Sequence, residues 1–198
     1  MVLKAVNMIR SIVQGVVSEG DLAVDATAGN GHDTLFLASL VGDSGLIYAF
    51  DNQQRALDIT RERLRAHRLE QRVKLICDGH ERMDKYVTDR VKAVVFNLGY
   101  LPGGDHGKTT LPGTTLTAVE KSLDLLLPGG ICAIAVYRGH GEGQREDALL
   151  REYLTSLDPR IYISVWAEAT NQRNNPPLVW LVQKKRGTCP TNYYRIIL

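Results

Sequence analysis

The chain of 198 residues has few of the features that mark secreted, membrane or metal-binding proteins. It holds only three cysteines, Cys77, Cys132 and Cys189, and no C-x-x-C pair, so neither a disulfide framework nor a zinc or redox site is expected. No apolar run approaches the roughly 18 residues that cross a bilayer, and no charged-then-apolar leader opens the chain. These absences predict reduced thiols and a cytoplasmic protein with no membrane contact and no metal.

A strong excess of charge is also missing. Lysine and arginine number 24 against 22 acidic residues, a formal net charge of +2, which permits a nucleic-acid partner but does not require one. The length suits a single domain with a full core. We expect one domain over residues 1–186, followed by a tail, residues 187–198, of uncertain order because it has no clear pattern.

A nucleotide-type cradle is predicted near the N-terminus. An apolar run over residues 22–24 ends in Asp25, the chain passes through Gly29 and Gly31, and apolar residues then recur at helical spacing up to Leu40. Glycines let a ligand approach the main chain closely, and the free N–H groups at a helix start favour polar or anionic ligand atoms. An incidental strand-to-helix turn is the alternative.

The cradle suits a cofactor that has an adenosine but no phosphates. The third glycine of the dinucleotide pattern is missing, because Thr34 stands in its place. A second apolar run, residues 46–50, ends in Asp51, about twenty residues past Gly31, where an acid grips a ribose hydroxyl in dinucleotide folds. S-adenosylmethionine fits both features. The residues expected to bind it are Asp25, Ala26, Thr27, Gly29, Asn30, Gly31, Asp33, Thr34, Asp51, Asn52, Gln53, Asp78, Gly79, His80, Asn97 and Leu98.

Strands and helices alternate from residue 21 to 157, and two strands follow in succession. The expected strands span residues 22–25, 46–50, 73–77, 93–96, 131–137, 161–168 and 178–183. Besides the cradle helix, helices are expected over residues 2–18, 53–67, 114–127 and 144–157. This order predicts an α/β fold with a Rossmann-like seven-stranded sheet, mostly parallel with an antiparallel last strand, and helices on both faces.

Polar loops follow several of the strands, at the edge of the sheet where such folds bind ligands. The loop over residues 97–106 is the best candidate for the reacting site, because it combines many polar groups with a proline and three glycines. The loop over residues 138–143 is similar. The catalytic candidates are Asn97, Tyr100, Asp105, His106 and His140. For Asp78-Gly79, a plain turn is the alternative to ligand contact.

Three separated phrases resemble one protein family. They are Asp25–Thr34, Asn97–Asp105 and Asn174–Pro177, and they agree in order and spacing with small bacterial proteins labelled putative rRNA methylases, within the class I S-adenosylmethionine-dependent methyltransferases. The resemblance covers roughly residues 1–186. It implies N-methylation of an amine, and Gram-positive members of the family methylate 5-aminomethyl-2-thiouridine at the tRNA wobble position.

For such a reaction the chain needs to align the amine and take up a proton. A simple alkyl ammonium has a pKa near about 10, and its lone pair is blocked while it is protonated. Asn97 suits this problem, since an amide oxygen accepts an amine N–H without stabilising the ammonium as a carboxylate would. Asp105 and His106, with His140 behind them, are the candidates for accepting the proton. The alternative to a catalytic role is turn formation for Asp105, and a surface or loop-bracing role for each histidine.

The expected partner is the anticodon stem-loop of a tRNA, bound by a monomer or a homodimer. Arginines could meet RNA phosphates, Tyr100 could stack on a base, and asparagines could pair with a uracil edge. The candidate substrate-binding residues are Arg138, Arg173, Asn174, Asn175 and Pro176. On the N-terminal helix, a solvated face is favoured over phosphate contact for Lys4 and Arg10. Methylation of rRNA or of a small amine is the alternative activity, and a non-catalytic adenosine-nucleotide binding module is a further one.

Overall fold

The structure is a computed structural model of the chain, and it describes residues 4–99, 110–139, 141–172 and 175–187. Its strands are β1 Leu22–Asp25, β2 Leu46–Asp51, β3 Val73–Cys77, β4 Val91–Asn97, β5 Leu126–Val136, β6 Tyr162–Glu168 and β7 Leu178–Lys184. Its helices are α1 Ala5–Gln14, α2 His32–Leu40, α3 Gln54–Ala66, α4 Pro112–Leu125 and α5 Gly141–Ser156, with short 3-10 helices η1 Glu70–Arg72 and η2 His80–Lys85.

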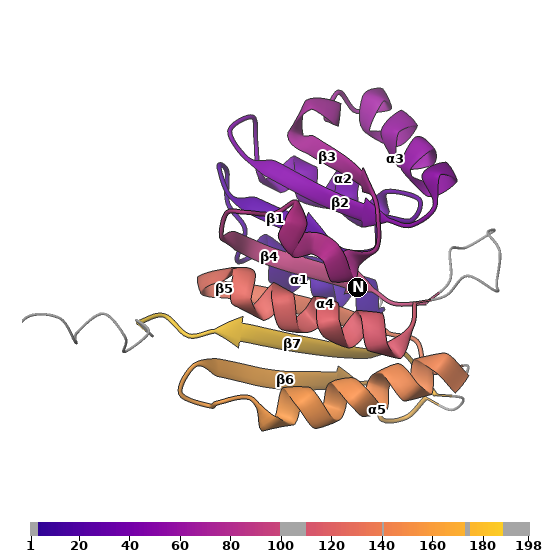
Figure 1. Ribbon diagram of the computed structural model, residues 1–198, viewed down its shortest axis with the longest axis vertical. Coiled ribbons are helices and arrows are strands. Elements are labelled where there is room, and N and C mark those ends of the chain that lie inside the picture. The colour runs from indigo at the N-terminus through magenta and orange to yellow at the C-terminus, as the bar shows by residue number, and fades with distance from the viewer. Residues whose placement is uncertain (1–3, 100–109, 140, 173–174, 188–198) are drawn as a thin grey trace, which may run out of the picture.

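Seven strands of the described residues form one sheet, in the order β3-β2-β1-β4-β5-β7-β6 (Figure 1). The pairs among β1 to β5 are parallel, whereas β7 runs antiparallel to both β5 and β6. The predicted Rossmann-like sheet, mostly parallel with an antiparallel last strand, is confirmed. The chain runs outward from β1 to β3 and then returns to place β4 on the other side of β1. Ligands bind at the carboxyl ends of strands beside such a reversal.

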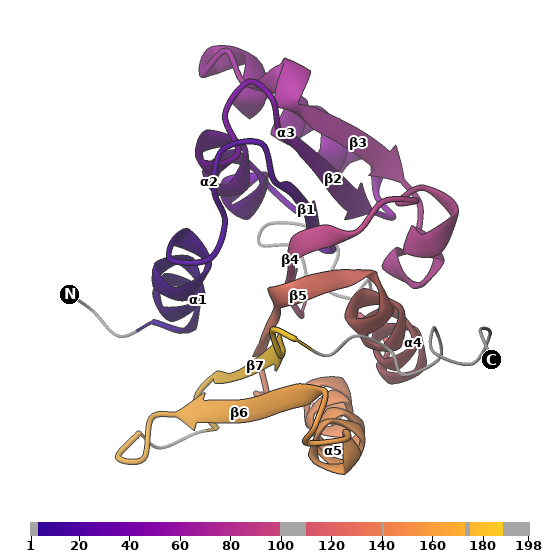
Figure 2. The same ribbon diagram turned by 90° about the vertical axis from the view of Figure 1, so that its left-hand side faces the viewer.

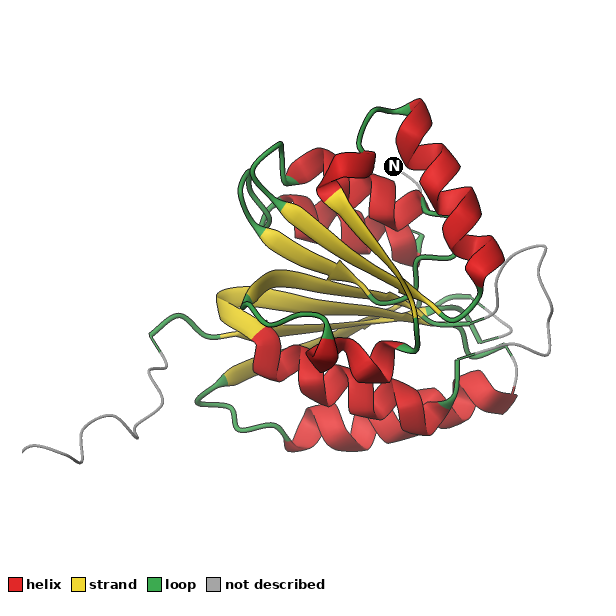
Figure 3. Cartoon of the chain, turned by 45° about the horizontal axis from the view of Figure 1, so that its top comes forward, coloured by secondary structure: helices red, strands yellow, loops and turns green. Residues whose placement is uncertain are grey.

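Helices cover both faces of the sheet, as predicted. Side chains of α1, α2 and α3, among them Ile9, Leu37 and Leu64, are buried on one face, and those of η2, α4 and α5 are buried on the other. Figure 2 shows α1 and α2 across the sheet from α4 and α5. Figure 3 shows the strands enclosed between the two helical layers.

The strands alternate their side chains between these two faces, as a period of two residues requires. In β4, Val94 and Phe96 pack in the cluster of α4 and α5, while Ala93 and Val95 pack in the cluster of α1 and α2. The strand residues beside α1 are small, Ala133 of β5 among them, and this lets α1 lie close against β4 and β5.

The structure departs from the sequence prediction at the start of β5. The strand was expected over residues 131–137, yet β5 already begins at Leu126, which pairs with Val91, and so includes the run Pro128-Gly129-Gly130. The register shifts before the next pair, and Gly129 has a φ of +79°. The run Pro128-Gly129-Gly130 therefore forms an irregular segment within β5, where the pairing register with β4 shifts. The helices η1 and η2 were not predicted, because elements this short give no periodic pattern.

Within the described ranges, no helix combines the length and apolar character needed to span a bilayer. Cys77 and Cys132 lie in strands, as predicted, and both are free thiols. Cys189 falls outside the described residues, as does the expected tail from residue 188 onward.

Candidate active site

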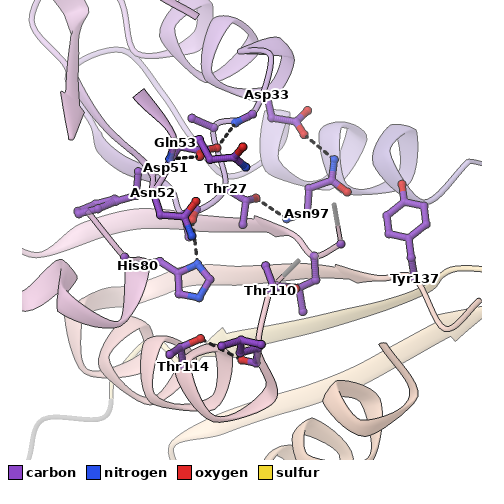
Figure 4. Close-up of a pocket in the computed structure, with 18 of the residues that line it drawn as sticks. Thr27, Asp33, Asp51, Asn52, Gln53, His80, Asn97, Thr110, Thr114 and Tyr137 are labelled. Atoms are coloured by element: carbon purple, nitrogen blue, oxygen red, sulfur yellow. Dashed lines mark hydrogen bonds between the residues drawn. The ribbon is translucent and has the colours of Figure 1, made fainter. Parts of the chain in front are cut away.

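A cavity of about 990 Å³ lies at the carboxyl ends of β1 to β5. It brings together most of the site residues predicted from the sequence, and Figure 4 shows how several of them face one another across it. The predicted residues that line it are Ala26, Thr27, Gly29, Asn30, Asp33, Asp51, Asn52, Gln53, Asp78, Gly79, His80, Asn97, Leu98, Arg138 and Asn175.

Asp25 and Thr34 do not line the cavity, because both are fully buried behind its wall. The hydroxyl of Thr34 donates to Asp25 Oδ2 at 2.6 Å, and the backbone N–H of Thr27 donates to Oδ1 at 3.1 Å. Burial, with a smaller contribution from the charge of Asp33, raises the pKa of Asp25 to about 7. The expected cofactor contact of these two residues is corrected to a supporting role, in which they join β1 to the start of α2.

Gly31 also lies outside the cavity lining, and its place is set by packing between helices. It precedes α2 with a φ of +78°. A Cβ at this position would lie 2.8 Å from Oγ1 and 2.9 Å from Cα of Thr60 in α3. Thr60 in turn donates through its hydroxyl to the carbonyl of Gly29 at 2.9 Å. The glycine allows α3 to press against the turn, which shapes the cradle.

We expect Gly31→Ala to lower the free energy of unfolding by about 2 kcal/mol, because the new Cβ meets backbone and the residue must keep a positive φ. Urea unfolding followed by circular dichroism measures the change. Gly113→Ala is the matched control, since nothing lies within 4 Å of a Cβ there, and its effect should stay within about 1 kcal/mol. Equal stability of the Gly31→Ala variant and the wild type would contradict this account of the cradle.

Five backbone N–H groups of the cradle are used inside the protein. Those of Ala26, Ala28 and Gly31 donate to backbone carbonyls at 2.8–2.9 Å, and those of Thr27 and Gly29 donate to the carboxylates at the ends of β1 and β2. A pyrophosphate needs several free N–H groups in such a turn. The N–H groups of the turn before α2 are therefore largely engaged, which agrees with the missing third glycine and with a cofactor that has no phosphates.

Asp51 is placed to hold a pair of hydroxyls. Its Oδ2 accepts the N–H of Gly29 at 2.9 Å, and its Oδ1 accepts the N–H of Gln53 at 2.8 Å. Each oxygen of a carboxylate can accept about two hydrogen bonds, so each keeps one lone pair for a ligand in the cavity. Burial raises the pKa of Asp51, and its two backbone hydrogen bonds lower it. This donor set fits the vicinal hydroxyls of a ribose.

Asp78 and His80 form the wall beyond Asp51. The Asp78 carboxylate accepts from Gly79 N–H at 2.8 Å, from Arg82 at 2.7 Å and from the Tyr86 hydroxyl at 2.8 Å. The Tyr86 bond is the main cause that lowers the pKa of Asp78. His80 is buried, and its Nδ1 lies 3.1 Å from the carbonyl oxygen of Ala26. Burial lowers its pKa, so the ring is neutral and ties η2 to the end of β1.

Asn97 ends β4 and lies on the cavity wall (Figure 4). Its backbone N–H donates to the Thr27 hydroxyl at 2.7 Å, which joins the ends of β4 and β1. Its side-chain Nδ2 donates to Asp33 Oδ2 at 3.5 Å. An ionised carboxylate can only accept, so the amide nitrogen faces Asp33 and the amide oxygen remains an acceptor for a ligand N–H.

Asp33 is held in turn by Arg10 of α1. Nε and Nη2 of Arg10 donate to Asp33 Oδ1 at 2.8 and 2.7 Å, which leaves Oδ2 facing Asn97. The sequence favoured a solvated face for Arg10, and this ion pair corrects it. The charge of Arg10 compensates the Asp33 carboxylate, so the surroundings of Asn97 are less anionic than Asp33 alone would make them.

The sequence prediction missed Tyr137, which follows β5 and lines the cavity. Its ring lies beside Gly99, where an added Cβ would be 4.0 Å from Tyr137 Cδ2. Burial, followed by the charge of Asp33, raises its pKa, so the phenol is neutral. The sequence did contain a signal, because Tyr137 stands at the carboxyl end of a predicted strand.

Other cavity residues were not among the predicted cofactor-binding, catalytic or substrate-binding residues. Thr110, Leu111 and Thr114 line the cavity from the start of α4. His32, the first residue of α2, also lines it and is exposed. The position of a helix start relative to a sheet edge depends on tertiary packing, so the chain alone did not single out Thr110, Leu111 or Thr114. His32, in contrast, stands in a predicted loop at the carboxyl end of a strand, as do His80, His106 and His140, and at least one of these histidines was expected to serve the site.

Arg138 lies on the cavity wall but is bound from within the protein. Its Nη2 donates to the Glu168 carboxylate and, at 3.2 Å, to the Pro176 carbonyl, and its Nη1 lies 3.6 Å from Asp147 Oδ2. Two carboxylates therefore compensate its charge. Arg138 thereby braces β5, β6 and the segment before β7, and its contact with RNA phosphates stays a prediction.

The structure describes two of the remaining predicted substrate-binding residues, Asn175 and Pro176. Asn175 lines the cavity with a φ of +51°, whereas Pro176 does not line it and the neighbouring Pro177 does. The predicted residues that lie outside the described part of the chain are Tyr100, Asp105, His106, His140, Arg173 and Asn174.

Comparison with known proteins places the chain in a family and identifies similar proteins and solved structures. The model of the family described as "Putative rRNA methylase" matches residues 47–183. A chloroplastic "tRNA (mnm(5)s(2)U34)-methyltransferase" of Arabidopsis thaliana is 33% identical over 192 residues, which cover 92% of this chain and 70% of that protein.

Among the solved structures similar to this chain, two match most of its length. The crystal structure titled "putative rRNA-methylase" from Clostridium thermocellum has a TM-score of 0.91 at 42% identity, over 93% of this chain and 99% of that one. A "putative methyltransferase" from Streptococcus mutans, crystallised in complex with SAH, has a TM-score of 0.85 at 38% identity, with the same coverage of 93% and 99%.

Proposed function

The chain belongs to the family described as "Putative rRNA methylase" and is an S-adenosylmethionine-dependent methyltransferase, and from this premise we propose that it N-methylates the 5-aminomethyl group of (2-thio)uridine at the tRNA wobble position. Residues 1–186 act as one domain in this proposal, in the cytoplasm. The name of the Arabidopsis relative, a tRNA mnm5s2U34 methyltransferase, supports the choice of substrate. The amide at the end of β4 supports the choice of an amine.

The cavity residues would hold the cofactor at three strand ends. In this assignment Asp51 binds the ribose hydroxyls through its two remaining lone pairs, the Gly29 turn allows close approach, and Asp78 with His80 borders the adenine. When bound, S-adenosylmethionine supplies an electrophilic methyl group on a sulfonium. The chain then has to bring an unprotonated amine into line with that methyl group.

The single observation that carries the amine assignment is the orientation of Asn97. Its Nδ2 is turned to Asp33 at 3.5 Å, so Oδ1 accepts one N–H of the substrate amine and directs its lone pair. A neutral amide does this without raising the pKa of the amine, as an ionised carboxylate would. The carboxylate of Asp33 would also raise the pKa of the amine, and its ion pair with Arg10 limits this effect.

Neighbouring groups complete the positioning. Tyr137, neutral and half-exposed beside Gly99, offers a ring on which the target base can stack. Thr110 and Thr114 face the same cavity from the other side. These residues keep the base between the end of β5 and the start of α4, with the amine directed to Asn97.

The test is methyl transfer from labelled S-adenosylmethionine to matched tRNAs. We expect label in tRNA that carries 5-aminomethyl-2-thiouridine at position 34, with the product nucleoside identified as the methylaminomethyl form by mass spectrometry. The same tRNA with unmodified uridine should stay unlabelled. Label in rRNA or in free small amines, with none in the aminomethyl tRNA, would overturn the substrate assignment.

A further inference from the structure

The basic charge of the chain is concentrated around α3. Residues 54–74 contain seven lysines and arginines against three acidic residues, an excess of four, although the whole chain has a formal net charge of only +2. A local excess of this kind attracts a polyanion. The question is which of these charges are free to meet one.

The arginines on one flank of α3 are already paired with carboxylates. Arg61 donates to Asp58 at 3.0 Å, and Arg65 donates to Glu70 at 2.7 Å. Surface pairs of this kind cancel each other's field at a distance. This flank therefore contributes little to binding an anion.

The other flank of α3 carries two arginines, Arg55 and Arg63, that form no ion pair with a carboxylate among the described residues. Arg63 donates through Nε to the backbone carbonyl of Asn30 at 2.7 Å, a neutral partner that leaves its charge uncompensated. Arg55 is exposed and has no acidic partner among the described residues. Positions four apart share a helix face, so Arg55, Ile59 and Arg63 form one stripe along α3.

This stripe adjoins the mouth of the cavity. Gln53, just before α3, and Asn30, the partner of Arg63, both line the cavity. His32 is exposed at the same mouth. Burial and the charges of Arg63 and Arg10 lower the pKa of His32, while Asp33 opposes them, so His32 sits in a net positive field as a neutral hydrogen-bonding group.

We propose that Arg55, Arg63 and His32, named here the α3 flank, bind backbone phosphates of the RNA strand that carries the target nucleotide. This proposal rests on the proposed function only in taking RNA as the substrate. Arg55 and Arg63 are eight residues apart, about 12 Å along the helix, so they meet different phosphates. The flank thereby holds the strand on the α2–α3 side while the base enters the cavity.

The experiment measures affinity for a fluorescent anticodon stem-loop RNA by anisotropy, at several salt concentrations and with S-adenosylhomocysteine present. Arg55→Gln and Arg63→Gln should each weaken binding about threefold to tenfold. Each should also lower the slope of log affinity against log salt by about 0.7 to 0.9. Arg65→Gln removes the same charge from the paired flank and should change affinity by less than about twofold.

The α3 flank could also bind a different anion, the carboxylate of the cofactor. Calorimetry with S-adenosylhomocysteine, which has this carboxylate but no phosphate, distinguishes cofactor binding from binding of RNA phosphates. Arg55→Gln and Arg63→Gln should each bind S-adenosylhomocysteine as the wild type does. Loss of this binding in Arg63→Gln, with RNA affinity unchanged, overturns the proposal, as does an equal effect of Arg65→Gln on RNA. Arg55 is exposed, so its substitution leaves the fold intact. The RNA affinity of Arg55→Gln therefore tests the proposal even if Arg63→Gln unfolds.

The outcome is independent of the methyl-transfer assay. A wild type that binds the RNA through the α3 flank but transfers no label contradicts the wobble-uridine activity and supports the surface. A wild type that transfers label, with RNA binding insensitive to Arg55 and Arg63, supports the activity and overturns the surface.

Discussion

Asn97→Ala is expected to lower kcat for methyl transfer by about 100-fold to 1,000-fold, the range seen when one preorganised hydrogen-bonding group is removed from an active site. The amide oxygen of Asn97 is the group assigned to align the amine, and alanine cannot replace it. The backbone N–H of residue 97 would still donate to Thr27, which it meets at 2.7 Å, so the end of β4 stays in place. Single-turnover transfer to the aminomethyl tRNA measures the loss.

Two measurements distinguish this role from damage to the fold. S-adenosylhomocysteine affinity of the Asn97→Ala variant should stay within about threefold of the wild type, since Asp51 and the Gly29 turn are untouched. Asn97→Asp keeps the shape but adds a carboxylate, which would raise the pKa of the bound amine. We expect its pH optimum to move upward. A kcat within about threefold of the wild type in Asn97→Ala would remove Asn97 from the mechanism.

Asp51→Ala should weaken S-adenosylhomocysteine binding about 100-fold, because two hydrogen bonds from hydroxyls to a carboxylate are lost. The affinity of Asp51→Asn for S-adenosylhomocysteine should lie between the affinities of Asp51→Ala and the wild type. Both oxygens of Asp51 already accept backbone N–H groups, from Gly29 and Gln53, so an amide must turn its NH₂ toward one of these donors. Isothermal calorimetry at fixed pH measures both affinities.

The matched control for Asp51→Ala is Asp58→Asn, which removes a carboxylate from the neighbouring helix α3. Asp58 is half-exposed and pairs only with side chains of its own helix, so its substitution should leave cofactor affinity unchanged. Thermal unfolding of each variant confirms that the fold persists. If Asp51→Ala and Asp58→Asn bind S-adenosylhomocysteine equally well, Asp51 does not hold the ribose.

Predictions from the sequence succeeded where the signal is local and periodic. Apolar runs located all seven strands, and the alternation with helices predicted the parallel order. Residues that end a strand were correctly expected at one edge of the sheet, because parallel strands present their carboxyl ends together. Asp51 and Asn97 belong to this group, as does Asp78. For the same reason Tyr137, at the end of a predicted strand, could have been included.

The sequence alone did not reveal which polar groups satisfy one another. Asp25 reads as a ligand-binding acid, yet the structure buries it against the Thr34 hydroxyl. Arg138 reads as a phosphate ligand, yet carboxylates from α5 and β6 bind it. Arg10, in a helix that seemed merely to cover the sheet, reaches Asp33 at 2.7 Å.

By itself, then, the chain determined the positions of the strands along the sequence, the cradle and the acids and amide at the strand ends, because each depends on neighbours within a few residues. Only the tertiary structure decided that Asp33 turns the amide of Asn97, that Gly31 makes room for Thr60, and that one flank of α3 keeps its charge. The contacts of Asn97 with Asp33, of Gly31 with Thr60 and of Arg63 with Asn30 join residues more than twenty positions apart, and a hydrogen bond or an ion pair exists only where folding brings its two members within about 3 Å.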